Sequence, residues 1–329
     1  MAKVLVAGGA GFIGSHTVLA LSEAGHDIII LDDLSNGHAD SVLSGTLIEG
    51  SIADRDTLDA VFAENAIDAV IHFAAFIEAG ESVKAPMAFY ENNVSGSLTL
   101  LQAMARHNVA NIVFSSTAAV YGQRDDLDLL SEDTRKQPIN PYGHSKWMVE
   151  CMLRDMAATG AINAVALRYF NAAGSDPEGR IGERHEPETH LIPLILDAAR
   201  GKRPNIKIFG TDYDTPDGTC IRDYIHVVDL ARAHVLAVEG LLNQQQDTGS
   251  YDAMNLGTSK GYSVREVIDA AKQVTGIEFE VIEEARRPGD PAKLVADASK
   301  AGRVLGWQAK RSDLKTLLED TWAFRRNLD

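Results

Sequence analysis

Tyr142 and Lys146, in the stretch PYGHSK, have side chains and a spacing that suit acid–base chemistry. Positions i and i+4 lie on one face of a helix, so we expect the two side chains to point in the same direction. A lysine ammonium beside a phenol favours the phenolate and lowers the pKa of the tyrosine, which makes Tyr142 a candidate general base. Taken alone, the pair is more typical of an ordinary helix surface, so its meaning depends on the neighbouring motifs.

Hydroxyl side chains end the strand-like run NIVFSS that precedes this helix. In a parallel sheet, ligands bind outside the carboxyl ends of the strands. Ser115, Ser116 and Thr117 occupy such an end, where a hydroxyl can bind the substrate oxygen that Tyr142 deprotonates. A hydroxyl that only satisfies the local backbone is the alternative.

The segment GGAGFIG supplies Gly8, Gly11 and Gly14 between a strand-like and a helix-like run. Glycines there allow a tight turn and close approach to a pyrophosphate, beside the free N–H groups of a helix N-terminus. Asp32 and Asp33 follow the next strand-like run, where a carboxylate accepts from the ribose of NAD and repels the 2′-phosphate of NADP. We therefore expect NAD, with Asp32 on the ribose; a structural turn and a solvated acidic turn are the alternatives.

The elements that must position these residues alternate between strand-like and helix-like runs through the first half of the chain. This order predicts parallel βαβ units, and hence an α/β fold with a Rossmann-like, doubly wound parallel sheet. The predicted strands are KVLVAGG, DIIILDD, GTLIEGS, IDAVIHFAA, NIVFSS and NAVALRYFN, and the predicted helices are 13–24, 55–65, 86–107 and 142–159.

The alternation ends after Asn171, where residues 176–190 are rich in Gly, Pro, Glu and His and predict a long loop. Long loops in compact domains are often functional. We expect an NAD-binding domain over 1–171, with a return segment near 222–240, and a smaller C-terminal lobe over 172–329 that binds the substrate.

Composition limits the partners. A formal net charge of −16 argues against nucleic acid and anionic membranes, and no apolar run is long enough to span a bilayer. The first residues lack the cleavage region of a signal peptide, and Cys151 and Cys220 build no disulfide framework, so we expect a cytoplasmic protein. No cluster of His, Cys and Asp has metal-site spacing, so we expect no metal.

The ordered set GxxGxxG, SST and YxxxK resembles the extended short-chain dehydrogenase/reductases. Longer blocks are similar to the UDP-glucose/UDP-galactose 4-epimerases, and the resemblance covers essentially the whole chain. These blocks are NPYGHSKWMVE, ALRYFNAAG, FGTDYDTPDGTCIRDYIHVVDLA, NLGTSKGYSV and RRPGDPAKLVADASKA.

The resemblance implies a redox-neutral epimerisation in which NAD stays bound and accepts hydride from C4 of the sugar before returning it to the opposite face. Tyr142 would take the proton of the 4-hydroxyl, Lys146 would hold the nicotinamide ribose, and Thr117 stands where many members have serine. The implied cofactor-binding residues are Gly8, Gly11, Phe12, Ile13, Gly14, Asp32, Asn36, Ser51, Ile52, Phe73, Ala74, Ala75, Asn92, Ser115, Tyr142, Lys146 and Tyr169.

The resemblance also implies a binding site for the nucleotide sugar, with arginines on the diphosphate and an apolar face on the uracil. A core position for Phe209 is an equal alternative. The implied substrate-binding residues are Thr117, Tyr142, Asn171, His190, Leu191, Phe209, Arg222, Arg287, Asp290 and Leu294.

Three positions depart from the family pattern. Ser51 replaces an aspartate near the adenine, and Ile77 replaces a lysine that some epimerases place near the cofactor. Leu294 stands where other members carry tyrosine or a small residue, which suggests room for an N-acetyl group.

The helices 86–107 and 142–159 resemble the pair that forms the dimer interface of the family, so we expect a homodimer. Epimerases of other UDP-sugars, such as UDP-GlcNAc/UDP-GalNAc or UDP-glucuronate, are the rival interpretation. A 4,6-dehydratase fits less well, because Ala118 and Ala119 follow Thr117 and cannot transfer a proton. A non-catalytic NAD-sensing protein is a further rival.

Overall fold

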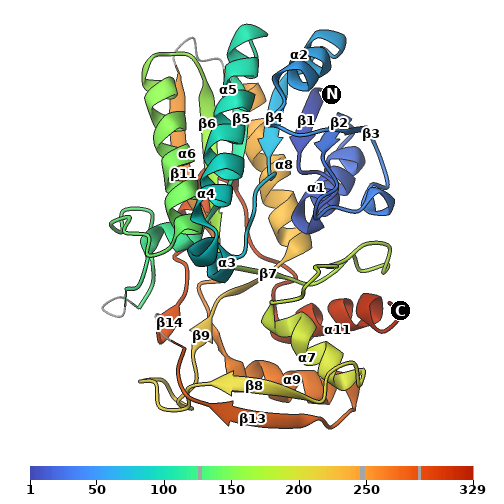
Figure 1. The fold of residues 1–329 in the computed structure, drawn as a ribbon, viewed down its shortest axis with the longest axis vertical. Coiled ribbons are helices and arrows are strands. Elements are labelled where there is room, and N and C mark those ends of the chain that lie inside the picture. The colour runs from blue at the N-terminus through green and yellow to red at the C-terminus, as the bar shows by residue number, and fades with distance from the viewer. Residues whose placement is uncertain (125–127, 245–248, 288–289, 329) are drawn as a thin grey trace.

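The computed structural model describes residues 1–124, 128–244, 249–287 and 290–328. They form a large layered part around a parallel sheet and a smaller lobe below it (Figure 1). Within these described ranges, no helix combines the length and apolarity needed to cross a membrane.

A seven-stranded parallel sheet forms the centre of the large part, which confirms the predicted fold class. Its order, β11-β6-β5-β4-β1-β2-β3, reverses direction beside β1, which creates the crevice where ligands bind in such sheets. The strands are β1 (Lys3–Ala7), β2 (Asp27–Asp32), β3 (Thr46–Glu49), β4 (Ala69–His72), β5 (Asn111–Thr117), β6 (Asn163–Tyr169) and β11 (Ser250–Leu256).

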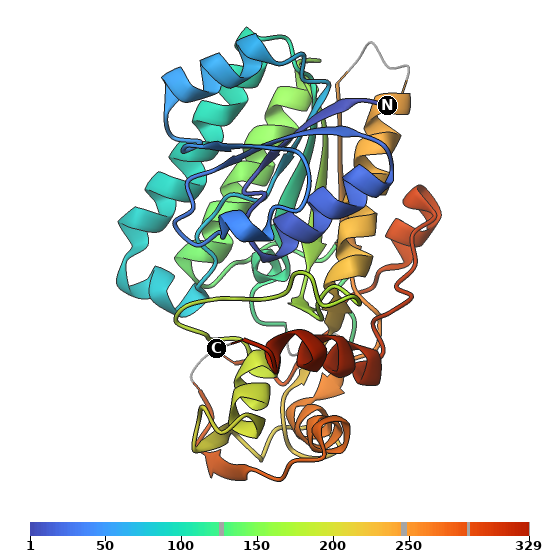
Figure 2. The same ribbon diagram turned by 90° about the vertical axis from the view of Figure 1, so that its right-hand side faces the viewer.

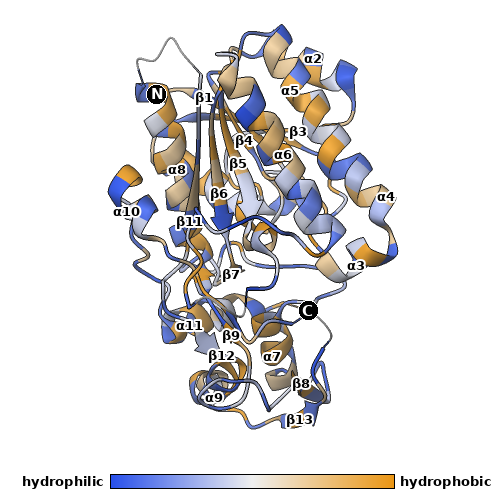
Figure 3. Cartoon of the chain, turned by 90° about the vertical axis from the view of Figure 1, so that its left-hand side faces the viewer, coloured by the Kyte–Doolittle hydropathy of each residue, from blue (hydrophilic) through white to orange (hydrophobic). Residues whose placement is uncertain are grey.

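Helices cover both faces of this sheet, so the inner strands are buried on both sides and are largely apolar (Figure 3). Along β1, Val4 and Val6 belong to the core under one layer of helices, whereas Leu5 and Ala7 belong to the core under the other. The first layer contains α1 (Phe12–Glu23), α8 (Val227–Asn243) and α10 (Ser299–Leu305), and the second contains α2 (Arg55–Glu64), α5 (Ser97–Arg106) and α6 (Pro141–Ala158).

The predicted helix over 86–107 is divided into three segments. These are α4 (Pro86–Phe89), a π-helical segment η2 (Tyr90–Gly96) and α5. A π-helical turn inserted in a helix is frequent at functional sites. The short helices α3 (Ala79–Lys84), η1 (Ala39–Ser41) and η3 (Ala118–Tyr121) lie in loops of the same part.

The smaller lobe has its own apolar core, in which α7 (Leu191–Ala199), α9 (Val264–Thr275) and α11 (Leu314–Arg325) pack together (Figure 2). Short strands complete the lobe and its junction with the large part. These are β7 (Asn171–Ala173), β8 (Asn205–Phe209), β9 (Ile221–Arg222), β10 (Tyr224–His226), β12 (Tyr262–Ser263), β13 (Glu280–Glu284) and β14 (Lys293–Leu294).

The chain returns from the lobe to the large part more often than the sequence suggested. The expected return segment is α8, which packs against α1 and the sheet. In addition, β11 pairs in parallel with β6, and the buried Trp307 donates its Nε1–H to the backbone oxygen of Asp229, at 2.8 Å. Residues beyond 171 are therefore integral to the sheet layer.

Truncation of a buried side chain in the return segment α8 tests whether this helix is part of the core of the large part. Leu230 of α8 is fully buried, so Leu230→Ala should lower the free energy of unfolding by about 2–5 kcal/mol. Leu43→Ala is the matched control, since Leu43 is 44% exposed and its loss should cost at most about 0.5 kcal/mol. Urea titration measures both values, and equal small losses would show that α8 is not part of the cooperative core.

Candidate active site

A cavity of about 530 Å³ lies at the carboxyl edge of the sheet. It is lined by residues that follow β1, β2, β4, β5 and β6, as expected for ligand binding in a parallel sheet. All of the residues assigned above to the cofactor line it: Gly8, Gly11, Phe12, Ile13, Gly14, Asp32, Asn36, Ser51, Ile52, Phe73, Ala74, Ala75, Asn92, Ser115, Tyr142, Lys146 and Tyr169.

The three motif glycines serve two different purposes. Gly8 has φ +83°, and a Cβ there would lie 2.5 Å from the backbone nitrogen of Ala74. A Cβ on Gly14 would lie 2.1 Å from the backbone oxygen of Gly8, so these two glycines permit the packing of loop on helix and strand. A Cβ on Gly11 would meet only that same oxygen, at 3.6 Å, so Gly11 is not required by protein packing. Its bare backbone leaves room for close approach of a ligand in the cavity, which fits a dinucleotide pyrophosphate.

Asp32 holds the glycine loop as well as lining the cavity. Its carboxylate accepts from the backbone N–H of Ala10 at 2.8 Å and from that of Leu34 at 2.9 Å. Burial raises the pKa of Asp32, and these two hydrogen bonds oppose that rise. The structural role of Asp32 was not predicted; its contact with the ribose stays a prediction.

The π-helical segment places two adjacent asparagines in different roles. Asn92 lines the cavity, as expected. Asn93 is buried, accepts from the backbone N–H of Phe76 at 2.8 Å and donates to the hydroxyl of Ser145 at 3.0 Å. Asn93 thus connects the loop after β4 with the helix that carries Tyr142.

Helix α6 brings Tyr142 and Lys146 to the cavity wall. It begins at Asn140, whose side chain accepts from the backbone N–H of Gly143 at 2.8 Å, and a proline occupies its first turn. Lys146 is buried and donates to the backbone oxygen of Ser115 at 3.0 Å. Both side chains and Thr117 line the same cavity, so the structure brings the predicted catalytic residues together.

The expected lowering of the tyrosine pKa is wrong for the protein groups alone. Burial raises the pKa of Tyr142 to about 12; a hydrogen bond with Thr117 lowers it, and the charge of Glu78 raises it. Burial also lowers the pKa of Lys146 to about 7. The reason is that both side chains are buried, which disfavours charge on either of them, and the lysine donates to the Ser115 carbonyl.

A segment from the second half of the chain, residues 182–190, contributes to the cavity lining, and we call it the strap. Arg184 donates to the carboxylate of Asp40 at 3.0 Å and to the hydroxyl of Ser41 at 2.8 Å. His185 lies 2.8 Å from the carboxylate of Glu78, which raises the pKa of the histidine. The strap is therefore attached to the segments that follow β2 and β4, and most of its residues line the cavity.

The strap also contains a cluster of His185, Glu188 and His190 whose candidate ligand atoms lie within 4.8 Å of one another. The ring of His190 lies 2.7 Å from the carboxylate of Glu183. Burial lowers the pKa of His190, but hydrogen bonds with Glu183 and Glu188 outweigh it and raise the pKa to about 10. In the structure, charge pairing of His190 with Glu183 and Glu188 holds this cluster together.

The residues assigned to the nucleotide sugar are divided between the cavity and the smaller lobe. Thr117, Tyr142, Asn171, His190 and Leu294 line the cavity. Leu191, Phe209, Arg222, Arg287 and Asp290 are outside its lining, although all are described.

In the lobe, two of the arginines already have partners. Arg222 lies 3.2 Å from the carboxylate of Asp290, and the guanidinium of Arg287 lies 3.7 Å from the ring centroid of Phe209. This stacking leaves a half-buried aromatic face at the lobe surface rather than a core phenylalanine.

Sequence reasoning missed several cavity residues. Among them are Glu78, Arg184 and His185, which act on the site through contacts between distant segments. The prediction of a long functional loop over 176–190 was the available signal, but it did not identify these side chains.

Comparisons with known proteins agree with this geometry. Residues 4–257 match the model of the NAD dependent epimerase/dehydratase family. The chain is 52% identical to the UDP-glucose 4-epimerase of Rhizobium meliloti (strain 1021), over 99% of this chain and 98% of that protein.

Two solved structures are also similar. That of a UDP-glucose 4-epimerase from Brucella ovis in complex with NAD has a TM-score of 0.94 and 46% identity, over 98% of both chains. That of a UDP-glucose 4-epimerase from Bifidobacterium longum in complex with NAD+ and UDP has a TM-score of 0.91 and 40% identity, again over 98% of both chains.

The buried lysine links stability to pH. The pKa of Lys146 is about 7 in the folded protein, against an ordinary value of 10.5. Between these two pH values, the folded protein binds fewer protons than the unfolded chain. The free energy of unfolding should therefore rise with pH across this window, and Lys146→Met should reduce the rise. Urea unfolding of protein freed of nucleotide, at a series of pH values, measures the slope. The exposed Lys260→Met is the matched control and should keep the wild-type slope; equal slopes in all three proteins would contradict the assignment.

Proposed function

The chain belongs to the NAD dependent epimerase/dehydratase family, and on this premise we propose that it is a UDP-glucose 4-epimerase. It interconverts UDP-glucose and UDP-galactose by redox-neutral epimerisation at C4 with bound NAD. The observation that carries the proposal is the meeting of Tyr142, Lys146 and Thr117 in one cavity with the glycine loop. An acid–base group and a dinucleotide site must share a cavity for such a reaction.

The cavity residues fit NAD. The open space at Gly11 suits the pyrophosphate, and Asp32 and Asn36 lie where the adenosine ribose is expected, since Asp32 ends β2 and Asn36 follows it. Ser51, which replaces the family aspartate, keeps a hydroxyl in the lining. When bound, NAD supplies the site that takes hydride from C4 of the sugar and returns it.

The side chains of the protein control the proton and the orientation. Tyr142 accepts the proton of the sugar 4-hydroxyl, and Thr117 binds the same oxygen. Lys146 holds the nicotinamide ribose, and its contact with the Ser115 carbonyl fixes the position of its ammonium. Because burial raises the pKa of Tyr142, the phenolate needs positive charge beside it, which Lys146 and the oxidised nicotinamide ring both provide.

The nucleotide part of the substrate lies between the cavity and the smaller lobe in this proposal. Residues 1–171, with the return segments, bind NAD, and the lobe within 172–329 binds the UDP-sugar. Arg222 and Arg287 pair with the diphosphate, which their bidentate guanidinium groups suit, and Phe209 packs on the uracil. Asp290, now beside Arg222, turns to the uridine ribose. His190 and Leu191 lie at the start of α7, which leads from the strap into the lobe.

Acceptance of further UDP-sugars as substrates is the second candidate function. Leu294 lines the cavity and packs against the buried apolar cluster that contains Tyr121. A leucine there leaves space that a tyrosine ring would fill, which favours acceptance of UDP-GlcNAc and UDP-GalNAc. Conversion of UDP-GalNAc by the same protein would establish this breadth, and no conversion would limit the enzyme to the plain sugars. UDP-glucuronate is tested in the same assay.

We also propose a homodimer. Apolar side chains are exposed on the neighbouring helices α3, α4, α5 and α6, which is unusual for a surface that faces only water. They are Val83, Met87, Leu98 and Met148, at 63%, 76%, 43% and 43% exposure. Both cysteines are free, which supports the cytoplasm, a reducing compartment, as the location.

Loss of the phenol should abolish turnover without loss of the cofactor. Purified protein mixed with UDP-galactose should form UDP-glucose without net production of NADH. Tyr142→Phe should lower kcat by about 10²–10⁴-fold, because the general base is removed, while bound NAD is retained. Separation of the two sugars measures kcat, and nucleotide released on denaturation measures NAD content.

Tyr262→Phe, in the smaller lobe, is the matched control and should keep wild-type turnover. Equal activity in Tyr142→Phe and wild type would reject the catalytic role. A wild-type protein that binds NAD but converts no UDP-sugar would favour the NAD-sensing rival.

The strap should slow the loss of NAD. Arg184→Ala removes the contacts with Asp40 and Ser41 that attach the strap beside the expected adenosine site, so NAD should dissociate at least about tenfold faster. The rate is measured by dilution into an NAD-scavenging enzyme. Arg265→Ala removes an exposed ion pair of the lobe and should leave the rate unchanged. Equal rates in the two variants would exclude the strap as a barrier.

A further inference from the structure

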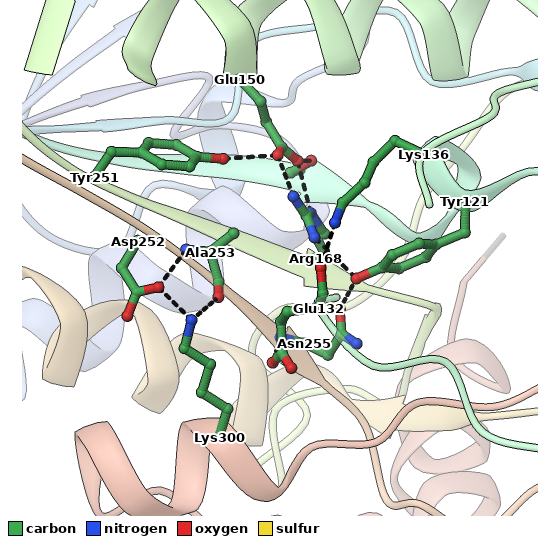
Figure 4. Close-up of polar contacts among 11 residues, drawn as sticks. Tyr121, Glu132, Lys136, Glu150, Arg168, Tyr251, Asp252, Ala253, Asn255 and Lys300 are labelled. Atoms are coloured by element: carbon green, nitrogen blue, oxygen red, sulfur yellow. Dashed lines mark hydrogen bonds and ion pairs between the residues drawn. The ribbon is translucent and has the colours of Figure 1, made fainter. Parts of the chain in front are cut away.

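A buried charge pair connects helix α6 with strand β6 of the sheet (Figure 4). Glu150 of α6 is 1% exposed and Arg168 of β6 is 2% exposed. The guanidinium donates to both carboxylate oxygens, with Nε at 2.9 Å. Nothing in the proposed reaction uses this pair, although burying two charges is costly.

The carboxylate of Glu150 connects α6 to three strands. Besides the two bonds from Arg168, it accepts from the hydroxyl of Ser116 on β5 and from that of Tyr251 on β11, the latter at 2.7 Å. A carboxylate that accepts four hydrogen bonds has all its acceptor sites occupied. Its position is therefore fixed by all three strands at once.

The third nitrogen of the Arg168 guanidinium, Nη1, extends the network past the end of β5. This nitrogen donates to the hydroxyl of Tyr121 at 2.9 Å, and that hydroxyl donates to the side chain of Asn255 at 2.6 Å. In the sheet, Arg168 is paired with Ser116 on one side and with Asn255 on the other. The network therefore holds one row of residues across β5, β6 and β11, together with the end of η3.

Four members of the network lie close in the sequence to residues of the proposed active site. These members are Ser116, Tyr121, Arg168 and Glu150. Ser116 directly precedes Thr117, and Tyr121 ends the short helix η3, which Thr117 caps. The network therefore holds the chain on both the N-terminal and the C-terminal side of Thr117. Arg168 precedes Tyr169, whose hydroxyl bonds Ser115. Glu150 lies one helical turn after Lys146 and two after Tyr142, on the same face of α6.

We propose that Glu150 and Arg168, acting through Ser116 and Tyr121, are positioning residues that set the placement of Thr117 relative to Tyr142 and Lys146. This inference rests on the proposed epimerase function. A buried ion pair is weak evidence for stability, since packed apolar side chains often do as well. Its value here is geometric, because a charged pair with four directed bonds has one arrangement, whereas an apolar contact tolerates several.

Removal of single hydroxyl groups tests the inference without leaving a buried charge unpaired. Ser116→Ala removes the bond to Glu150 on one side of Thr117, and Tyr121→Phe removes the bonds with Arg168 and Asn255 on the other. Each should lower kcat for UDP-galactose by about tenfold or more, since small misplacements of reacting groups are costly, with KM changed less than about twofold. Thr321→Ala is the matched control, since it removes the hydrogen bond of another buried hydroxyl, in α11 of the smaller lobe and outside this network, and should leave kcat within about twofold.

The three variants are compared by kcat, KM, NAD content and melting temperature. A fall of kcat in Ser116→Ala and Tyr121→Phe but not in Thr321→Ala, at similar melting temperatures, supports positioning. Equal kcat in all three variants, or a fall that follows melting temperature, overturns it and leaves a structural role. An inactive wild-type protein would instead reject the epimerase function, which the assay with UDP-galactose detects first.

Discussion

The parallel register of the central sheet is the constraint on which the rest of the structure depends. Because β1, β2, β4, β5 and β6 run in one direction, their carboxyl ends meet at a single edge, and each of them delivers residues to the cavity. The helices that follow β1 and β5 begin at the same edge, which places the glycine loop and the first turns of α6 opposite each other. A dinucleotide site and an acid–base site are thereby brought together by topology.

The sequence predicted features that local patterns specify. The alternation of strands and helices, the glycine loop and the spacing of Tyr142 and Lys146 each lie within a few consecutive residues. Features made by distant segments were missed. β11 is separated from its partner β6 by the whole first half of the lobe, and the strap meets Asp40 and Glu78 across more than one hundred residues. No local pattern indicates such pairings, since they depend on how the lobe returns to the sheet.

The tyrosine pKa shows the same limit at the level of one side chain. The spacing of i and i+4 fixes a common helix face, but it does not fix how deeply that face is buried or what else the lysine can reach. Burial acts on both groups and favours the neutral phenol and the neutral amine. The ammonium of Lys146 is positioned by its hydrogen bond to the carbonyl of Ser115, which belongs to β5 and not to the helix that carries the lysine. The charge states of Tyr142 and Lys146 therefore depend on the tertiary structure and do not follow from their spacing in the sequence.

An epimerase that returns hydride to the opposite face of the sugar must bind the two ends of its substrate, the sugar and the nucleotide, in opposite ways. The sugar must turn over within the site, so substrate contacts cannot be what holds Tyr142, Lys146 and Thr117 in place. Their geometry must come from the protein side, where Glu150 and Arg168 bind the row of residues behind them. The nucleotide, in contrast, must be bound firmly while the sugar moves, and its assigned residues lie in a separate lobe with its own core. The division between a rigid sheet edge and a distinct lobe therefore matches the division between chemistry and binding.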